Sequence, residues 1–160
     1  MQPSYAVHFV DESEPLGTAG SLRYLTGKFE KPFFVTNCDI LVKTDYASLY
    51  EFHLNGGYDI SLVASGKAYV IPYGTCELNG DGHLSHINEK PSYDFLINTG
   101  LYVLNPEVLG LIPEGAFFHI THLIEKAKEK GLTVGVFPID DDAWLDVGQW
   151  AEYRKAVAVL

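Results

Sequence analysis

Basic residues and cysteines are scarce in this chain of 160 residues. It contains 11 Lys and Arg against 21 Asp and Glu, has a formal charge of −10, and has two cysteines. Without clustered cations it cannot neutralise a nucleic-acid backbone, which excludes nucleic acid as a partner. Cys38 and Cys76 show no metal-ligand spacing, and so few cysteines predict a reduced, cytoplasmic protein.

Long apolar runs and several catalytic motifs are also missing. No segment approaches the roughly 20 apolar residues that span a bilayer, and the first residues lack the basic region and apolar core of a signal peptide. Neither a membrane partner nor export is therefore expected. The sequence contains no Gly-x-Ser-x-Gly and no Walker loop, so neither a serine-hydrolase nucleophile nor a P-loop is expected.

Apolar periodicity alternates between strand and helix along most of the chain, which predicts a layered α/β fold in a single domain spanning residues 1–160. Strands are expected at 5–10, 32–36, 60–64, 97–104 and 134–138, with a hairpin at 74–78 and 84–88. Helices are expected at 18–26, after Thr44 as the capping residue, after Asn105, at 120–130, and beyond residue 149.

Two aspartates are candidate Mg²⁺ ligands. Asp39 follows the strand at 32–36, at the edge where open α/β sheets bind ligands, and Asp146 lies in the stretch Trp-Leu-Asp-Val-Gly. Since Mg²⁺ sites use one or two carboxylates with substrate phosphate oxygens, the pair indicates phosphate chemistry. The alternatives are a turn at Asp39 and helix capping by Asp146 with Gln149. The run 140–142 of three aspartates is expected to be solvated.

A glycine-bearing loop precedes the first expected helix, where backbone groups can approach a base or a phosphate closely. The alternative is an ordinary turn and helix cap. The loop residues are Leu16, Gly17, Thr18, Ala19 and Gly20.

Three further motifs could contact a substrate. Glu89-Lys90-Pro91 offers a carboxylate for sugar hydroxyls and an ammonium group for a phosphate, with an exposed ion pair as the alternative. Asn98-Thr99-Gly100 interrupts a strand, which is unfavourable unless a ligand or another backbone comes close, and Tyr73-Gly74 gives a similar signal. His119 and His122 lack a third ligand, so structural or solvent-facing roles are expected.

In their order along the chain, these motifs resemble those of the sugar-1-phosphate nucleotidyltransferases, and the resemblance covers nearly the whole chain. It implies an α/β, Rossmann-like three-layer αβα fold with a mixed sheet. It also implies a Mg²⁺-dependent enzyme that joins a nucleoside triphosphate to a sugar 1-phosphate, releasing pyrophosphate and forming a nucleotide sugar.

The resemblance also implies a role for each motif. Leu16 to Gly20 would contact the nucleobase, and Asp39 and Asp146 would hold Mg²⁺. Lys90 would meet the sugar phosphate, and the sugar itself would be surrounded by Gly74, Glu89, Asn98 and Thr99. The Leu-Gly-Thr-Ala-Gly form of the base loop favours GTP. Mannose, glucose or glucosamine 1-phosphate, or a phosphocholine-type acceptor, all stay open.

One departure from the family pattern concerns the triphosphate. Members of the family have a first strand and a Gly-x-Gly-Thr-Arg loop followed by a Pro-Lys pair, and this chain contains neither. The chain is therefore expected to be an N-terminally truncated, partial catalytic domain with impaired activity. Its unpaired sheet edges favour a homodimer or a strand-exchanged oligomer.

Two other functions are compatible with the motifs. One is a non-catalytic module that binds a nucleotide sugar or a sugar phosphate. The other is a nucleotide-sugar-dependent glycosyltransferase, although the Asp-x-Asp motif typical of those enzymes is replaced here by Asp39-Ile40-Leu41.

Overall fold

The computed structural model describes residues 5–148, which divide into two compact units. One unit contains the described residues up to 36 together with 45–62 and 102–135. The other contains 37–44, 63–101 and the described residues from 136 onward. Long strands contribute residues to both units.

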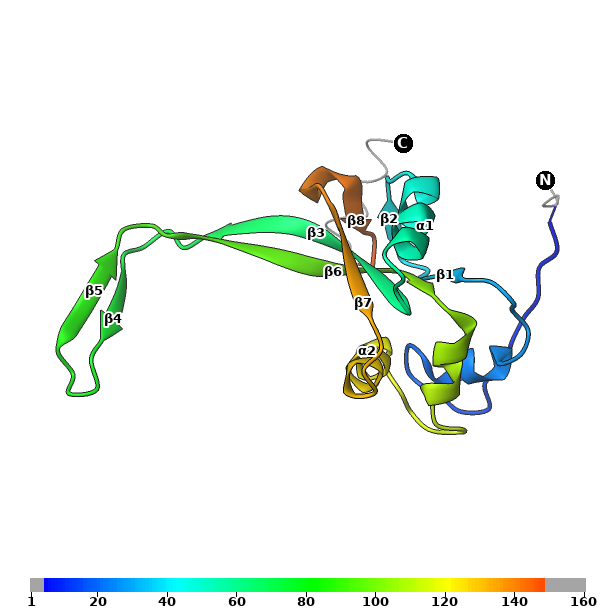
Figure 1. The fold of residues 1–160 in the computed structure, drawn as a ribbon. Coiled ribbons are helices and arrows are strands. Elements are labelled where there is room, and N and C mark those ends of the chain that lie inside the picture. Colours follow the sequence, from blue (N-terminus) through cyan, green and yellow to red (C-terminus); the bar gives the residue numbers. More distant parts are fainter. Residues whose placement is uncertain (1–4, 149–160) are drawn as a thin grey trace. The chain divides into compact units, whose positions relative to one another are not determined.

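A four-stranded sheet has the strand order β1-β6-β3-β7 (Figure 1). Its strands are β1 (Phe33–Thr36), β6 (Ser92–Leu104), β3 (Ile60–Val70) and β7 (Val134–Ile139). The first half of β3 and the last half of β6 are buried almost continuously. Such continuous burial is typical of strands covered on both faces.

Helical segments of the first unit supply its core. They are η1 (Gly20–Leu25), α1 (Tyr46–Asn55), η2 (Pro106–Leu111) and α2 (Ile120–Glu129). Helix α2 buries Ile120, Leu123 and Ala127, whose spacing places them on one face. It ends before Gly131, which has a φ of 76° that favours glycine. These side chains join Ile60, Leu104, Val108 and Leu109 in one buried cluster.

The N-terminal cap of α1 is Asp45, whereas the sequence predicted Thr44. Asp45 has extended backbone angles, and its carboxylate accepts hydrogen bonds from the Ala47 N–H at 2.9 Å and the Ser48 hydroxyl at 2.7 Å. The helix begins one residue later than expected, so the capping position also moves by one.

These hydrogen bonds predict a pH-dependent contribution to stability. The Ser48 hydroxyl and the backbone N–H groups of Ala47 and Ser48 lower the pKa of Asp45. A depressed folded-state pKa stabilises the fold above the unfolded-state value of about 3.9, and this stabilisation is lost as pH falls through the lower folded-state pKa. Asp45→Asn should keep the cap but remove this acid-range dependence, which thermal melting between pH 2 and 6 would detect. Identical pH profiles would contradict the assignment.

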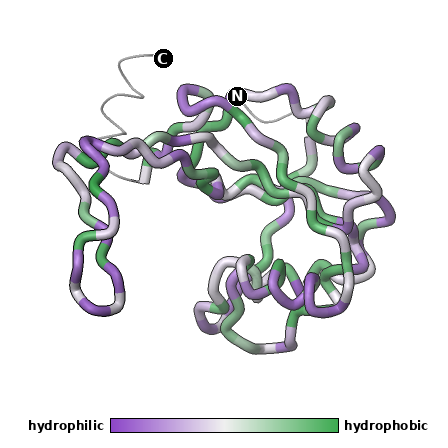
Figure 2. The backbone as a smooth tube through the Cα atoms, turned by 60° about the vertical axis from the view of Figure 1, so that its left-hand side comes forward, coloured by the Kyte–Doolittle hydropathy of each residue, from purple (hydrophilic) through white to green (hydrophobic). Residues whose placement is uncertain are grey.

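The second unit carries the predicted hairpin. Strands β4 (Thr75–Leu78) and β5 (Leu84–Asn88) pair antiparallel, with Thr75 opposite Asn88. The turn contains Gly82 at a φ of 85°. Figure 2 shows that this turn is hydrophilic, whereas both strands of the hairpin include hydrophobic residues. The hairpin is confirmed at the predicted positions because its turn chemistry is local.

Two very short strands of the second unit have no counterpart in the prediction. Strand β2 (Ile40–Val42) pairs antiparallel with β8 (Trp144–Asp146), and η3 (Asp141–Ala143) immediately precedes β8. Asp146 therefore ends a strand. The helix that it was suggested to cap would lie beyond Gly148, outside the described residues.

The segment 5–10 is not a strand, contrary to its alternating pattern. No strand among the described residues pairs with it, and Tyr5 and Phe9 are 73% and 86% exposed. Without a neighbouring strand, its backbone groups have no ladder to join. Within residues 5–148, no helix has the length and apolar character needed to cross a membrane.

Candidate functional site

The pairing of β2 with β8 brings the two candidate metal ligands together. Ile40 lies opposite Asp146, and the Val147 N–H donates to the Asp39 carbonyl oxygen at 2.9 Å. At the other end of the pair, the Lys43 N–H donates to the Ala143 carbonyl oxygen at 2.8 Å. These bonds fix the register of the two strands. Asp39, just before β2, and Asp146, at the end of β8, are therefore neighbours.

Gly148 marks the point where the two carboxylates converge. A β-carbon built on Gly148 would lie 2.9 Å from Asp39 Oδ2 and 3.1 Å from Asp146 Oδ1. The Gly148 N–H also donates to Asp146 Oδ1 at 3.0 Å. Asp39 is exposed and Asp146 is half-buried. Two carboxylate oxygens thus face one small space that a side chain at position 148 would fill.

This convergence predicts that Gly148→Ala impairs function through the carboxylates. Its β-carbon must displace Asp39, and a misplacement near 1 Å can cost about 100-fold in rate. We expect at least a tenfold loss of turnover, with the free energy of unfolding changed by less than about 0.5 kcal/mol because the residue is exposed. Gly80→Ala is the matched control, since a β-carbon there meets nothing within 4 Å. Equal turnover in the two variants would contradict this role of Gly148.

The two carboxylates suit a cation that takes its remaining ligands from water and from the substrate. Within the described residues, no group of three or more His, Cys, Asp or Glu is arranged to hold a metal ion. Mg²⁺ does not need such a group, because it retains water and is often bound by one or two carboxylates with phosphate oxygens. The donor set of Asp39 and Asp146 fits that ion.

The base of the hairpin gathers three more of the candidate residues. Gly74 precedes β4 and Glu89 follows β5, so the pairing of Thr75 with Asn88 makes them neighbours. A β-carbon on Gly74 would lie 3.1 Å from Glu89 Oε2. Lys90 is exposed and has a φ of 46°, the one positive φ among the described non-glycine residues. Strained backbone of this kind clusters at functional sites.

Residues 98–100, which the sequence suggested would interrupt a strand, lie inside β6, and contacts within the chain explain them in part. Gly100 has a φ of 91°, and a β-carbon there would lie 2.6 Å from Asn37 Nδ2. The Asn37 N–H also donates to the Gly100 carbonyl oxygen at 3.0 Å. Thr99 is buried, and its hydroxyl donates to the Val63 carbonyl oxygen at 2.9 Å. Asn98 is exposed and accepts a hydrogen bond from the Gly100 N–H at 3.2 Å.

The loop Leu16–Gly20 belongs to the first unit and is attached to the start of α2. The Phe118 N–H donates to the Leu16 carbonyl oxygen at 2.8 Å, and the Ala19 N–H donates to the Phe118 carbonyl oxygen at 2.9 Å. Gly17, at a φ of 78°, leaves room for that same carbonyl. The glycine requirement at position 17 thus already follows from packing within the chain.

Thr18 and the two histidines complete this attachment. The Thr18 hydroxyl oxygen accepts a hydrogen bond from the Ile120 N–H at 3.0 Å and lies 3.4 Å from His119 Nδ1. The His119 N–H donates to His122 Nδ1 at 3.3 Å. Thr18, His119 and His122 therefore form hydrogen bonds at the start of α2.

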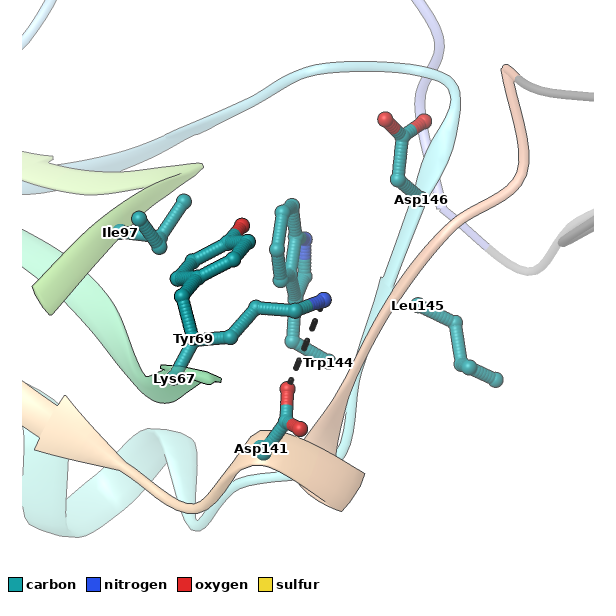
Figure 3. Close-up of a pocket in the computed structure, with 7 residues that line it drawn as sticks. All are labelled: Lys67, Tyr69, Ile97, Asp141, Trp144, Leu145 and Asp146. Carbon is teal, nitrogen blue, oxygen red and sulfur yellow. Dashed lines mark ion pairs between the residues drawn. The ribbon is translucent and has the colours of Figure 1, made fainter. Parts of the chain in front are cut away.

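A pocket beside Asp146 contains residues that the sequence did not indicate. It has a volume of about 230 Å³, and all its lining residues belong to the second unit. Figure 3 shows Lys67 and Tyr69 from β3 on one wall and Trp144 on another. Lys67 forms an ion pair with Asp141, which lies in the acidic run expected to be merely solvated. The alternating direction of side chains along a strand is the signal that would have placed Lys67 and Tyr69 together.

Comparisons with known proteins identify the family. The family model described as nucleotidyl transferase matches residues 2–160. Mannose-1-phosphate guanyltransferase 2 of Candida glabrata is 35% identical over 153 residues, which cover 89% of this chain and 41% of that protein. Mannose-1-phosphate guanyltransferase of Yarrowia lipolytica is 36% identical over 163 residues, covering 96% and 43%. The chain thus spans about two fifths of the length of these relatives.

Solved structures agree in fold. HddC from Yersinia pseudotuberculosis superimposes with a TM-score of 0.64 at 26% identity, covering 91% of this chain and 63% of that one. The same protein complexed with GMP-PN gives a TM-score of 0.65 at 25% identity, covering 92% and 64%. The α/β, Rossmann-like fold is confirmed. With the family model matching almost its full length, the chain belongs to the nucleotidyl transferase family, as its ordered motifs predicted.

Proposed function

We propose that the protein containing this chain transfers a nucleotide from a nucleoside triphosphate to a sugar 1-phosphate, giving a nucleotide sugar and pyrophosphate. The observation that carries the proposal is the pairing of β2 with β8, which gathers Asp39 and Asp146 around Gly148. Family membership indicates the class of reaction. The two converging carboxylates could bind a cation, which would neutralise the phosphate charge that develops in this reaction.

Nucleotidyltransferases of this family generally use a divalent metal, and we propose Mg²⁺ held by Asp39 and Asp146. When bound, this ion would neutralise charge on the α-phosphate. The Gly148 N–H orients Asp146 by donating to Oδ1, which leaves Oδ2 available as a ligand. The Val147 N–H, which donates to the Asp39 carbonyl oxygen, fixes the backbone of Asp39 beside Asp146.

The proposed acceptor contacts lie at the base of the hairpin and on β6. Glu89 would accept hydrogen bonds from sugar hydroxyls close to Gly74, where the absence of a side chain leaves room. Asn98 is exposed and would offer its amide to the sugar. Thr99 would contribute by aligning β6, because its hydroxyl is bonded to Val63. Lys90 would hold the sugar phosphate as a point charge.

The chemistry requires alignment more than acid–base catalysis. An oxygen of the sugar phosphate would attack the α-phosphorus, while the bond from that phosphorus to the pyrophosphate oxygen breaks. The attacking oxygen is already anionic, so no general base is needed. Lys90 would position this anion for in-line attack, which is the contribution that phosphoryl-type transfer asks of a protein.

The proposed nucleotide is GTP and the proposed acceptor is mannose 1-phosphate or a related hexose 1-phosphate. The names of the relatives and the GMP-PN complex of HddC support this choice. Leu16 to Gly20 would contact the base, chiefly through its backbone because Leu16, Ala19 and Gly20 are buried.

Pyrophosphate release tests the proposal. The protein containing this chain would be incubated with Mg²⁺ and a matrix of nucleoside triphosphates and sugar 1-phosphates. We expect release with one preferred pair, GTP and mannose 1-phosphate. Binding of the nucleotide sugar without any turnover would indicate a binding module instead. Consumption of a nucleotide sugar only when an acceptor alcohol is added would indicate a glycosyltransferase.

A further inference from the structure

Among the described residues that line the pocket beside Asp146, Lys67 is the only cation. It points from β3 into the same space as Tyr69, and the sequence of the strand fixes this because the two residues are two positions apart. Figure 3 shows its ammonium group between the pocket wall formed by Trp144 and the carboxylate of Asp141. A positive charge is therefore held in a pocket that a proposed metal ligand, Asp146, also lines.

The hold of Asp141 on Lys67 is weak. Lys67 Nζ and Asp141 Oδ1 are 3.9 Å apart, and the two side chains are 40% and 61% exposed. Charge-assisted hydrogen bonds between an ammonium group and a carboxylate are normally about 2.7–2.9 Å long, and exposed ion pairs contribute little to stability. The ammonium group is thus available to a stronger anionic partner that enters the pocket.

Trp144, which also lines the pocket, carries a donor with no acceptor among the described residues. The indole N–H of Trp144 is buried, and no hydrogen-bond partner for it exists within residues 5–148. Buried polar groups are nearly always paired, so this donor calls for an acceptor from outside residues 5–148. The missing group must accept a hydrogen bond, as a phosphate oxygen does and a cation does not.

We propose that Lys67 is a further substrate-binding residue that contacts a phosphate group of the substrate next to Asp146, and that Asp141 occupies it when no substrate is bound. The proposal rests on the proposed function, because that function brings a sugar phosphate to Asp146. It adds a second cation to Lys90, which lies at the base of the hairpin. An anionic substrate would exchange the weak ion pair for a stronger one.

Substitutions of Lys67 and of Asp141 should change the affinity for phosphate ligands in opposite directions. Binding of mannose 1-phosphate and of inorganic phosphate, each with Mg²⁺, would be measured on the chain by calorimetry. Lys67→Met should weaken both affinities by about tenfold, the loss of one charge-assisted contact. Asp141→Asn should strengthen both by about twofold, because it releases Lys67 from a weak exposed pair. Lys67→Arg should retain most of the affinity.

Lys43→Met is the matched control, since Lys43 is an exposed lysine of the same unit outside the pocket. Affinities for Lys67→Met equal to those of Lys43→Met would overturn the proposal, as would weaker binding by Asp141→Asn. Lys67-dependent binding of inorganic phosphate without binding of mannose 1-phosphate would support the anion site and count against the proposed sugar substrate. If the wild-type chain bound neither ligand, the proposed anion site would be overturned. The proposed function is tested separately, by pyrophosphate release.

Discussion

Replacing Asp39 or Asp146 by Asn should lower turnover by about 1,000-fold in the protein that contains this chain. Each substitution removes a negative ligand from the proposed Mg²⁺ site but keeps the size of the side chain. Preorganised charge at the reacting group is commonly the largest catalytic contribution, and the loss of one such element costs about 100- to 1,000-fold. Rates of pyrophosphate release at saturating substrate would measure the effect.

Asp140→Asn and Asp142→Asn are the matched controls for this prediction. Both remove one carboxylate from an exposed run near β8 and change the net charge by the same amount. They should leave turnover within about twofold, since surface charges away from the site act only through screened interactions. If Asp39→Asn or Asp146→Asn retained the rates of these controls, the metal assignment would be wrong.

Replacing His53 by Leu should produce a large loss of stability in the first unit. His53 is 1% exposed; its Nδ1 lies 2.9 Å from the Ser61 hydroxyl and its Nε2 lies 3.1 Å from Asn105 Oδ1. Asn105 also donates through Nδ2 to the Tyr58 carbonyl oxygen. Its Oδ1 is therefore an acceptor, so His53 donates from Nε2 and accepts the Ser61 hydroxyl proton at Nδ1.

Leucine at position 53 would leave the buried Ser61 hydroxyl and the half-buried Asn105 Oδ1 without this partner. We expect a loss of about 2–4 kcal/mol in the free energy of unfolding, measured by urea denaturation. Adding Ser61→Ala should recover about 1 kcal/mol, because it removes one of the unpaired groups. His83→Leu, at a side chain that is 79% exposed, is the control. A double variant less stable than His53→Leu alone would contradict the network.

The sequence predicted elements whose signals are local. The hairpin follows from its Asn-Gly-Asp-Gly turn, and α2 follows from the spacing of its apolar residues and from Gly131. Strands β3 and β6 extend beyond their predicted limits, to Ile60–Val70 and Ser92–Leu104, because their outer halves are exposed and lack a continuous apolar pattern. Asn105 was expected to cap a helix, but its side chain bonds His53 and Tyr58 instead, which only tertiary structure can specify.

The candidate site was harder to predict because it depends on long-range pairing. Strands of three residues such as β2 and β8 are too short to show a period, although they are what brings Asp39 to Asp146. The motif order identified both aspartates without indicating the geometry. Lys67 belonged to no motif and Asp141 only to the acidic run expected to be solvated, so their ion pair could be found only once β3 and the segment before β8 had been placed in space.

Paramagnetic broadening by Mn²⁺ would show directly whether Asp39 and Asp146 form one cation site. Substoichiometric Mn²⁺ would be added to the isotope-labelled chain and amide signals followed by NMR. We expect selective broadening around Asp39, Ile40, Val147 and Gly148, and its loss in the Asp39→Asn, Asp146→Asn double variant. Broadening centred instead on Asp140 to Asp142, or unchanged by the double substitution, would contradict it.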